Sequence, residues 1–208
     1  MNRYDFNLIH SFIDTKNPKP ELNYALVMQD GICATDTQKA IKYHILMLDC
    51  SGVLASKKIV KCVASMMGKD DTASIGADGV VYISQGDKIS LDNRDVDFKY
   101  PDIHRVLDEK LQYVFELDDI SDLHFELTQK ECFIDDVHLN PIIEYGGCSK
   151  YVISYNKQEV TADTTNTGRV KIVGIHNVDD EVDAVKFTAM IMGREFKTQA
   201  KEQLLLDL

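Results

Sequence analysis

The sequence predicts an α+β fold in which antiparallel sheets carry their helices on one face. Three observations favour this prediction. The first 110 residues repeat one order of elements twice, a helix followed by three β-rich runs. In each repeat an Asp-Gly pair separates two of the runs, which is a strong hairpin signal. The 208 residues are 44% apolar and 27% charged, as in a globular protein with a proper core. The alternative is that this order of elements is accidental.

The first helix is expected at Tyr4–Thr15 and is ended by Asn17–Pro20. Its apolar residues recur close to a helical period; they are Phe6, Ile9, Phe12 and Ile13. Three strands should follow. The first has strand-like alternation at Leu22, Tyr24, Leu26 and Met28. We expect a type I′ turn at Asp30-Gly31, which needs positive φ at both central residues. The other two strands are expected at Ile32–Thr35 and Ile41–Leu48.

The second helix should begin after the N-cap Ser56, run to about Met67 and end at Gly68. One face of it is apolar, with Ile59, Val63, Met66 and Met67. The other face carries Lys57, Lys58, Lys61 and Ser65. Three further strands are expected at Thr72–Ala77, Val80–Ser84 and Lys88–Asp92. Two such repeats side by side would form one antiparallel sheet layer with both helices on one face.

The second half is less regular and follows an exit segment at Val96–Lys110. We expect strands at Leu111–Leu117, Leu123–Leu127, Lys150–Tyr155, Glu159–Thr164, Arg169–His176 and Ala184–Met192. A helix is expected at Phe133–Tyr145, interrupted or restarted at Pro141 and ended by Gly146-Gly147. The predicted domains are residues 1–110 and 111–196, followed by a tail at 197–208.

Composition excludes several classes of protein. The formal charge of −11 argues against general nucleic-acid binding through a basic surface, although a local basic face remains compatible with it. No apolar run approaches the roughly 18 residues that cross a bilayer, and the N-terminus lacks a signal peptide's apolar region. Five cysteines without CxxC spacing indicate reduced thiols in a cytoplasmic protein. We therefore expect no membrane partner.

No arrangement of residues predicts catalysis. The six histidines are scattered, and the Asp-Asp pairs lack the spacing of a calcium loop, so no metal site is predicted. The segment Gly146–Lys150 lacks the GxxxxGK[ST] pattern of a nucleotide-binding loop. There is no GxSxG, and no cysteine stands where its pKa would be lowered. We expect a protein that is not an enzyme and needs no cofactor.

Two segments carry a family resemblance. One is Ala34-Thr35-Asp36-Thr37-Gln38-Lys39-Ala40, and the other is Tyr100-Pro101-Asp102-Ile103-His104-Arg105-Val106. They resemble the middle domain of the bacterial DNA polymerase III beta sliding clamp, which has Ala-Thr-Asp-Gly-His-Arg-Leu-Ala and Phe-Pro-Asp-Tyr-x-Arg-Val. That domain is itself a twofold repeat of a helix with strands. The resemblance implies a DNA-clamp-like fold with two clamp-type domains, and it is strongest over residues 1–110.

In that family these segments help to line a pocket for short peptides from polymerases and other clamp users. The positions implied here are Thr35, Thr37, Gln38, Lys39, Pro101, Arg105 and Val106. Three of them depart from the family pattern: Thr37 replaces Gly, Gln38 replaces His and Lys39 replaces Arg. Clamp rings contain six such domains, so two per chain would make a homo-oligomer, a trimer that encircles DNA without catalysing a reaction in replication or repair.

Clamp helices line the channel and the sheets form the outer wall, so Lys57, Lys58 and Lys61 would face DNA. A charged, solvated helix face explains the same lysines equally well. The alternative function is a monomeric accessory or regulatory protein, such as one encoded by a phage, that does not encircle DNA.

The tail ends in Gln203-Leu204-Leu205-Leu206-Asp207-Leu208. It fits the Gln-Leu-x-Leu-x-Leu form of the motif by which bacterial proteins dock onto the β clamp, with Gln203, Leu204, Leu206 and Leu208 as its anchors. It could bind a true β clamp or the pocket of a neighbouring chain. The alternative is an amphipathic helix packed on its own domain, because Phe196, Ala200, Leu204 and Leu208 fall at helical spacing.

Overall fold

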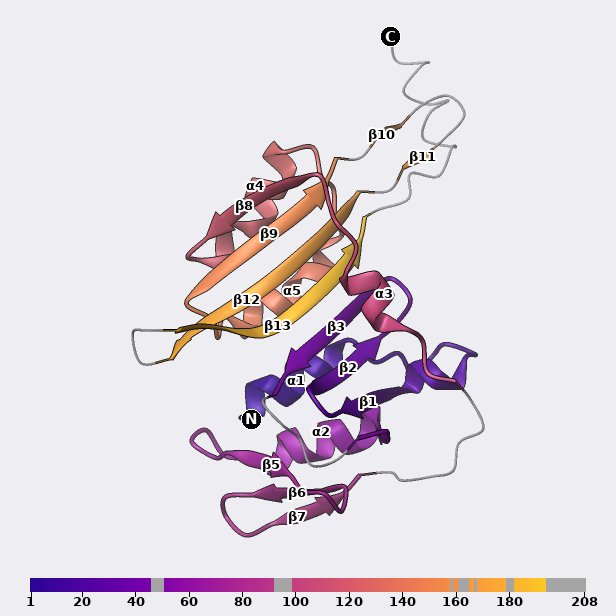
Figure 1. Ribbon diagram of the computed structural model, residues 1–208, viewed down its shortest axis with the longest axis vertical. Helices are drawn as coiled ribbons and strands as arrows, with labels where there is room; N and C mark the ends of the chain where they lie inside the picture. Colours follow the sequence, from indigo (N-terminus) through magenta and orange to yellow (C-terminus); the bar gives the residue numbers. More distant parts are fainter. Residues whose placement is uncertain are drawn as a thin grey trace.

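One antiparallel sheet of eight strands runs through the computed structural model (Figure 1). The structure describes residues 1–45, 51–91, 99–157, 159–160, 165–166, 168–178 and 182–193. In spatial order the strands are β4 (Val53–Ser56), β1 (Tyr24–Met28), β2 (Gly31–Thr35), β3 (Lys39–His44), β13 (Val182–Met192), β12 (Arg169–Val178), β9 (Lys150–Asn156) and β8 (Tyr113–Leu117). A separate hairpin joins β10 (Glu159–Val160) to β11 (Thr165–Asn166).

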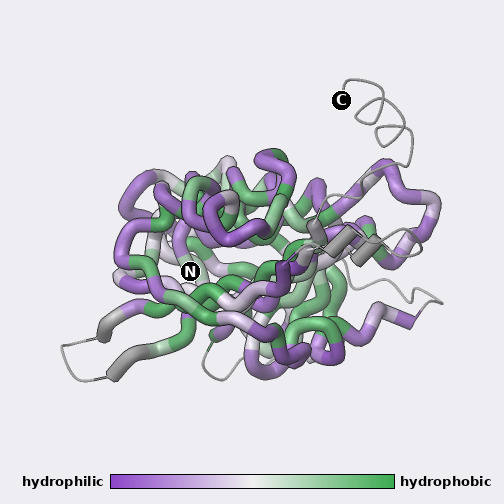
Figure 2. The backbone as a smooth tube through the Cα atoms, turned by 90° about the horizontal axis from the view of Figure 1, so that it is seen from above, coloured by the Kyte–Doolittle hydropathy of each residue, from purple (hydrophilic) through white to green (hydrophobic). Residues whose placement is uncertain are grey.

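The two halves of the chain meet where β3 pairs with β13, with Tyr43 opposite Phe187. One buried core contains residues of both halves, and Figure 2 shows the more hydrophobic segments gathered in the interior. The two predicted domains therefore share a sheet and a core, and the boundary between them stays a prediction.

Four helices cover one face of this sheet. They are α1 (Arg3–Ser11), α2 (Lys57–Met66), α4 (Leu123–Gln129) and α5 (Asp136–Tyr145). The short helix α3 (Ile103–Leu107) lies on the opposite face, in front of β3 and β13 in Figure 1. Because side chains alternate along a strand, β3 turns Ile41 toward α1 and Ala40 toward α3. The predicted helices on one face are confirmed, and α3 is an exception that the prediction did not include.

The second set of strands forms a sheet of its own: β5 (Ala73–Ile75), β6 (Val80–Ile83) and β7 (Lys88–Ser90). The prediction that both repeats form one layer was therefore wrong. The unpredicted strand β4 occupies the edge of β1, and β13 occupies the free edge of β3, so neither edge is available. The small sheet instead packs into the core beside α1 and α2, and the Ala73 N–H donates to the Met1 carbonyl at 2.7 Å.

The first Asp-Gly turn is not of type I′. Met28 pairs with Gly31, so Gln29 and Asp30 are the central residues, and neither has positive φ. Gly31 (φ 156°) opens β2 instead, where a Cβ would lie 2.2 Å from the Tyr43 carbonyl oxygen. In the second turn Gly79 does have positive φ, 71°. The glycines are thus needed for two different reasons, close approach and a left-handed backbone.

The predicted strand Leu123–Leu127 is the helix α4. Leu123 and Leu127 are buried, four residues apart, while Phe125 between them is 63% exposed. A strand would have placed all three on one face. The 3-10 turn η2 (Ile120–Asp122) leads into this helix. Further along, α5 begins at Asp136 and continues through Pro141 without interruption, and Gly146 ends it in the left-handed conformation, as expected.

The helix α2 begins after its Ser56 N-cap as predicted, but its buried face differs. Val60, Val63 and Ala64 are buried, whereas Met66 is 37% exposed. No helix within the described ranges is long and apolar enough to cross a membrane.

Candidate functional site

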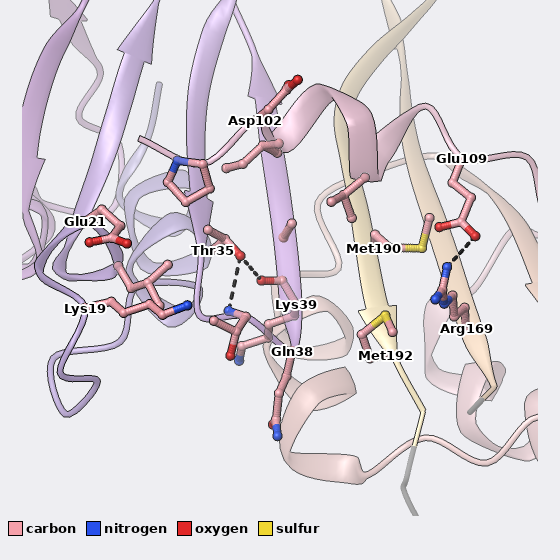
Figure 3. A pocket seen from close by; sticks show the side chains of 16 residues that line it. Lys19, Glu21, Thr35, Gln38, Lys39, Asp102, Glu109, Arg169, Met190 and Met192 are labelled. Atoms are coloured by element: carbon pink, nitrogen blue, oxygen red, sulfur yellow. Dashed lines mark hydrogen bonds and ion pairs between the residues drawn. The ribbon is translucent and has the colours of Figure 1, made fainter. Parts of the chain in front are cut away.

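A pocket of about 410 Å³ lies on the α3 face of the sheet (Figure 3). Segments from five parts of the chain form it: the 3-10 turn η1 (Pro20–Asn23), the β2–β3 turn, α3, the start of β12 and the last residues of β13. It brings together six of the seven positions implied by the resemblance, namely Thr35, Thr37, Gln38, Lys39, Pro101 and Val106. The seventh, Arg105, is exposed and does not line this pocket.

The helix α3 is fixed to the sheet at both ends. Before it, the Tyr100 hydroxyl lies 3.1 Å from the Tyr24 carbonyl and 3.2 Å from that of Cys33. After it, the Lys171 ammonium donates to the carbonyls of Leu107 and Glu109, at 3.1 and 2.6 Å. These bonds hold α3 against the sheet, where it forms one wall of the pocket.

The start of α3 follows from its sequence. Pro101 precedes the N-cap Asp102, whose Oδ1 accepts the Arg105 N–H at 3.3 Å. Ile103 and Leu107 then point to the sheet, where they pack with Cys33, Ala40 and Met190. Val106 is left 39% exposed at the pocket.

The β2–β3 turn is held by its own side chains, as Figure 3 shows in part. The Thr35 hydroxyl donates to the Lys39 carbonyl at 2.9 Å and accepts the Thr37 N–H at 3.3 Å. Asp36 Oδ1 accepts the N–H groups of Gln38 and Lys39 at 3.0 and 2.9 Å. These bonds place Thr37 at φ 80°, a conformation that strains a β-branched residue. The glycine of the family pattern would carry no such strain.

Lys39 lines the pocket, but its side chain is buried and its ammonium is paired with a carboxylate. Its ammonium lies 5.1 Å from the centre of the Phe12 ring and 3.8 Å from the Asp36 carboxylate, and the side chain is buried. Burial lowers the pKa of this lysine, against the influence of Asp36. At the other side of the pocket, Arg169 forms an ion pair with Glu109 (Figure 3).

Comparison with solved structures assigns the fold. The DNA polymerase III beta chain from Streptococcus pneumoniae TIGR4 superposes with a TM-score of 0.57 and 10% identity, covering 93% of this chain and 62% of its own. This chain has the beta sliding-clamp fold. A DnaN sliding clamp from Bartonella birtlesii, in a structure bound to griselimycin, is 16% identical with a TM-score of 0.41, over 97% of this chain and 53% of its own. No family model matches the sequence, and no curated protein matches it.

The predicted clamp fold is thereby confirmed. This chain spans 62% of the length of the Streptococcus clamp. Several pocket residues were not found from the sequence. Met190 and Met192 reach the pocket through the pairing of β13 with β3, and Arg169 reaches it on β12. No local sequence pattern identifies these three residues as pocket residues. The one local signal is that Met190 and Met192 are two positions apart, which places both side chains on the same face of a strand.

The three lysines of α2 do not behave alike. Lys58 and Lys61 are exposed. Lys57 is half-buried and donates to the Ile13 carbonyl, and burial lowers its pKa despite the nearby carboxylate of Asp14. Two of the three cations are therefore free to meet a polyanion. The predicted clamp-binding tail, with Gln203, Leu204, Leu206 and Leu208, lies outside the described residues.

No reactive centre stands out elsewhere in the described part of the chain. It contains no group of three or more His, Cys, Asp or Glu residues able to hold a metal ion. Cys33 and Cys132 are buried, which raises the pKa of each thiol to about 12. Burial also raises the pKa of Cys148 to about 11. Such thiols are poor nucleophiles at neutral pH.

Proposed function

We propose that the chain is a non-catalytic, sliding-clamp-like protein of DNA replication or repair, whose pocket beside α3 receives short segments of partner proteins. One observation carries this proposal. Two segments more than sixty residues apart, Thr35–Lys39 and Pro101–Val106, converge on one partly apolar pocket of a clamp fold. The polymerase or loader that would supply such a segment is to be sought among proteins with short apolar linear motifs.

The sheet supports assembly into a ring. It begins at β4 and ends at β8, and no described strand pairs with the outer edge of either. Unpaired strand edges favour pairing with another chain. With two clamp-type domains per chain, six domains require a trimer. Exposed Lys58 and Lys61 would then supply weak, salt-sensitive attraction to DNA in the channel.

The test of DNA encirclement is topological. The protein is loaded on nicked circular DNA, with and without subsequent linearisation, and its retention is measured at a salt concentration that removes simple electrostatic binding. A ring stays on the circle and leaves the linear form. Equal retention on both, or a mass in solution equal to one chain at high concentration, contradicts encirclement.

A second function is favoured by the negative charge around the helices of the second half, α4 and α5. Residues 118–145 include α4 and α5 and contain eight acidic residues against the single Lys130: Asp118, Asp119, Asp122, Glu126, Glu131, Asp135, Asp136 and Glu144. An acidic helix layer repels DNA. The alternative is therefore a monomeric accessory protein, for which binding to a purified β clamp through Gln203–Leu208, in the absence of DNA, is the deciding measurement.

A further inference from the structure

The wall that β13 contributes to the pocket is apolar. Met190 and Met192 line the pocket together with Val106 of α3, which remains 39% exposed. In Figure 3 the two methionines follow one another along β13, with Met190 nearer to α3 and Met192 farther from it. Met190 is only 1% exposed because α3 covers it, so the accessible apolar lining is Val106 together with the partly buried Met192. Such a concave, partly exposed apolar lining is suited to an apolar occupant.

The pocket lies where the described part of β13 ends. Met192 lines it, and the next residue, Gly193, donates its N–H to the Gly168 carbonyl of the neighbouring segment. Residues 194–208 follow directly. Four of residues 204–208 are leucine. A leucine-rich segment is thus tethered to the wall of the pocket itself.

We propose that Gln203–Leu208 of the same chain docks into this pocket and masks it from partner proteins. The proposal rests on the proposed function of the pocket as a peptide site and adds a means of regulating it. Alternate side chains of an extended segment point to one side. Leu204, Leu206 and Leu208 would therefore contact the pocket, while Leu205 and Asp207 face solvent.

The tether is long enough for this return. Leu204 follows Met192 by twelve residues, and twelve extended residues span at most about 40 Å. That length allows the chain to leave β13, reverse and come back. A short tether also gives the segment an effective concentration in the millimolar range. A second copy of the chain would have to reach a similar concentration in solution to compete, so the segment of the same chain is the occupant.

Masking has a measurable consequence. The apparent affinity for an external peptide falls by the fraction of molecules whose pocket is open. A tethered segment that occupies the pocket in nine molecules of ten lowers that affinity about tenfold. Weakening the segment should restore the affinity without any change in the pocket.

The test uses full-length chains and a fluorescent synthetic peptide with the sequence of residues 200–208, titrated by anisotropy. The double variant Leu204→Asp/Leu206→Asp should bind the peptide about tenfold more tightly than the unchanged chain. Leu205→Asp, which adds a charge on the opposite side of the segment, is the matched control and should bind as the unchanged chain does. Adding Val106→Asp to the double variant should abolish binding, whereas adding Val114→Asp, on an exposed valine of β8, should not.

Every other outcome of this experiment contradicts a specific part of the proposal. Equal affinity of the unchanged and double-variant chains overturns masking but leaves the pocket as a peptide site, provided that Val106→Asp still abolishes binding. Binding that survives Val106→Asp, or no binding by any variant, overturns the pocket and the masking together. Masking that weakens as the protein is diluted shows that a second copy supplies the segment, which overturns docking within one chain.

Discussion

The same face of the eight-stranded sheet is covered differently in the two halves of the molecule. In the first half, α1 and α2 lie in a core that the small sheet β5–β7 extends, with Val81 fully buried. In the second half, no described strand covers α4 and α5. Phe125 of α4, Val137 of α5 and Phe133 in the segment between them are exposed, at 63%, 67% and 42%. The small sheet thus covers part of the first helix layer and leaves Lys58 and Lys61 of α2 exposed, whereas no described strand covers the second layer, although both layers rest on one continuous sheet.

In the second half, the residues that stabilise the fold are therefore different from the residues that determine the chemistry of the surface. The apolar residues that stabilise the second half must lie between the helices and the sheet, since those outside remain in water. The outer side of α4 and α5 is then free to carry the acidic residues that the α2 face lacks. The comparison predicts which substitutions cost stability and which do not.

The largest expected effect separates the inner and outer sides of α4. Leu123→Ala removes a fully buried side chain, and such truncations lower the free energy of unfolding by about 2–5 kcal/mol. Phe125→Ala, two residues along the same helix, should change it by less than about 0.5 kcal/mol. Urea unfolding of both variants measures the difference. A large loss for Phe125→Ala would show that another part of the chain covers this surface.

The second effect concerns one side-chain contact between the halves, in addition to the pairing of β3 with β13. The Tyr145 hydroxyl of α5 donates to buried Asp5 of α1 at 2.8 Å, and the Lys186 ammonium lies 3.7 Å from the same carboxylate oxygen. Tyr145→Phe keeps the ring but removes a bond to a charged group, so we expect a loss of about 1.5–3 kcal/mol. The control is Tyr82→Phe, whose hydroxyl donates to Asp78 at the surface. If both variants lose equally little, the halves are not coupled through Asp5.

The elements that the sequence predicts correctly are those specified by residues close together in the chain. The Ser56 cap and the helix α2 were predicted because their signals are local. β4 was not, since four residues, Val53–Ser56, run straight into that helix and leave no room for a strand pattern. The apolar residues of Leu123–Leu127 fit a strand and a helix equally well, and only the exposure of Phe125 decides between them.

The pocket shows the same limit. The resemblance identified Thr35–Lys39 and Pro101–Val106, because each segment is continuous in the sequence. Met190, Met192 and Arg169 could not be found in this way. They reach the pocket only because β13 crosses from the second half to pair with β3, and no local pattern specifies that pairing.

The third effect compares two strained residues, one in each half. Thr37 (φ 80°) and Glu131 (φ 58°) are the non-glycine residues with positive φ among those described. Thr37→Gly should raise the free energy of unfolding by about 1 kcal/mol, since a β-branched residue is poorly tolerated there. Glu131→Gly relieves less strain and removes the ion pair with Lys157, at 2.7 Å, so it should be close to neutral. Thermal unfolding of both variants tests this, and a loss of stability for Thr37→Gly contradicts the assigned strain.

The smallest effect concerns the charge around α2. Burial, and then the ammonium groups of Lys57 and Lys61, lower the pKa of His10 from 6.5 to about 4. Between these values the unfolded chain takes up a proton at this histidine and the folded chain does not. The free energy of unfolding should therefore fall as the pH drops from about 6.5 to about 4.

The isolating variant is His10→Gln, which cannot titrate. Because the imidazole is half-exposed, solvent screens much of the effect, and His10 should account for less than about 1 kcal/mol of that fall. Burial also lowers the pKa of His44 and His138, so the variant should flatten the pH dependence only in part. The measurement is urea unfolding from pH 7 to pH 4.5 for both chains. Lys61→Gln should also reduce the pH dependence of the free energy of unfolding slightly, since it removes one of the two cations near His10. If the curves of all three chains superpose, the lysines of α2 do not act on His10.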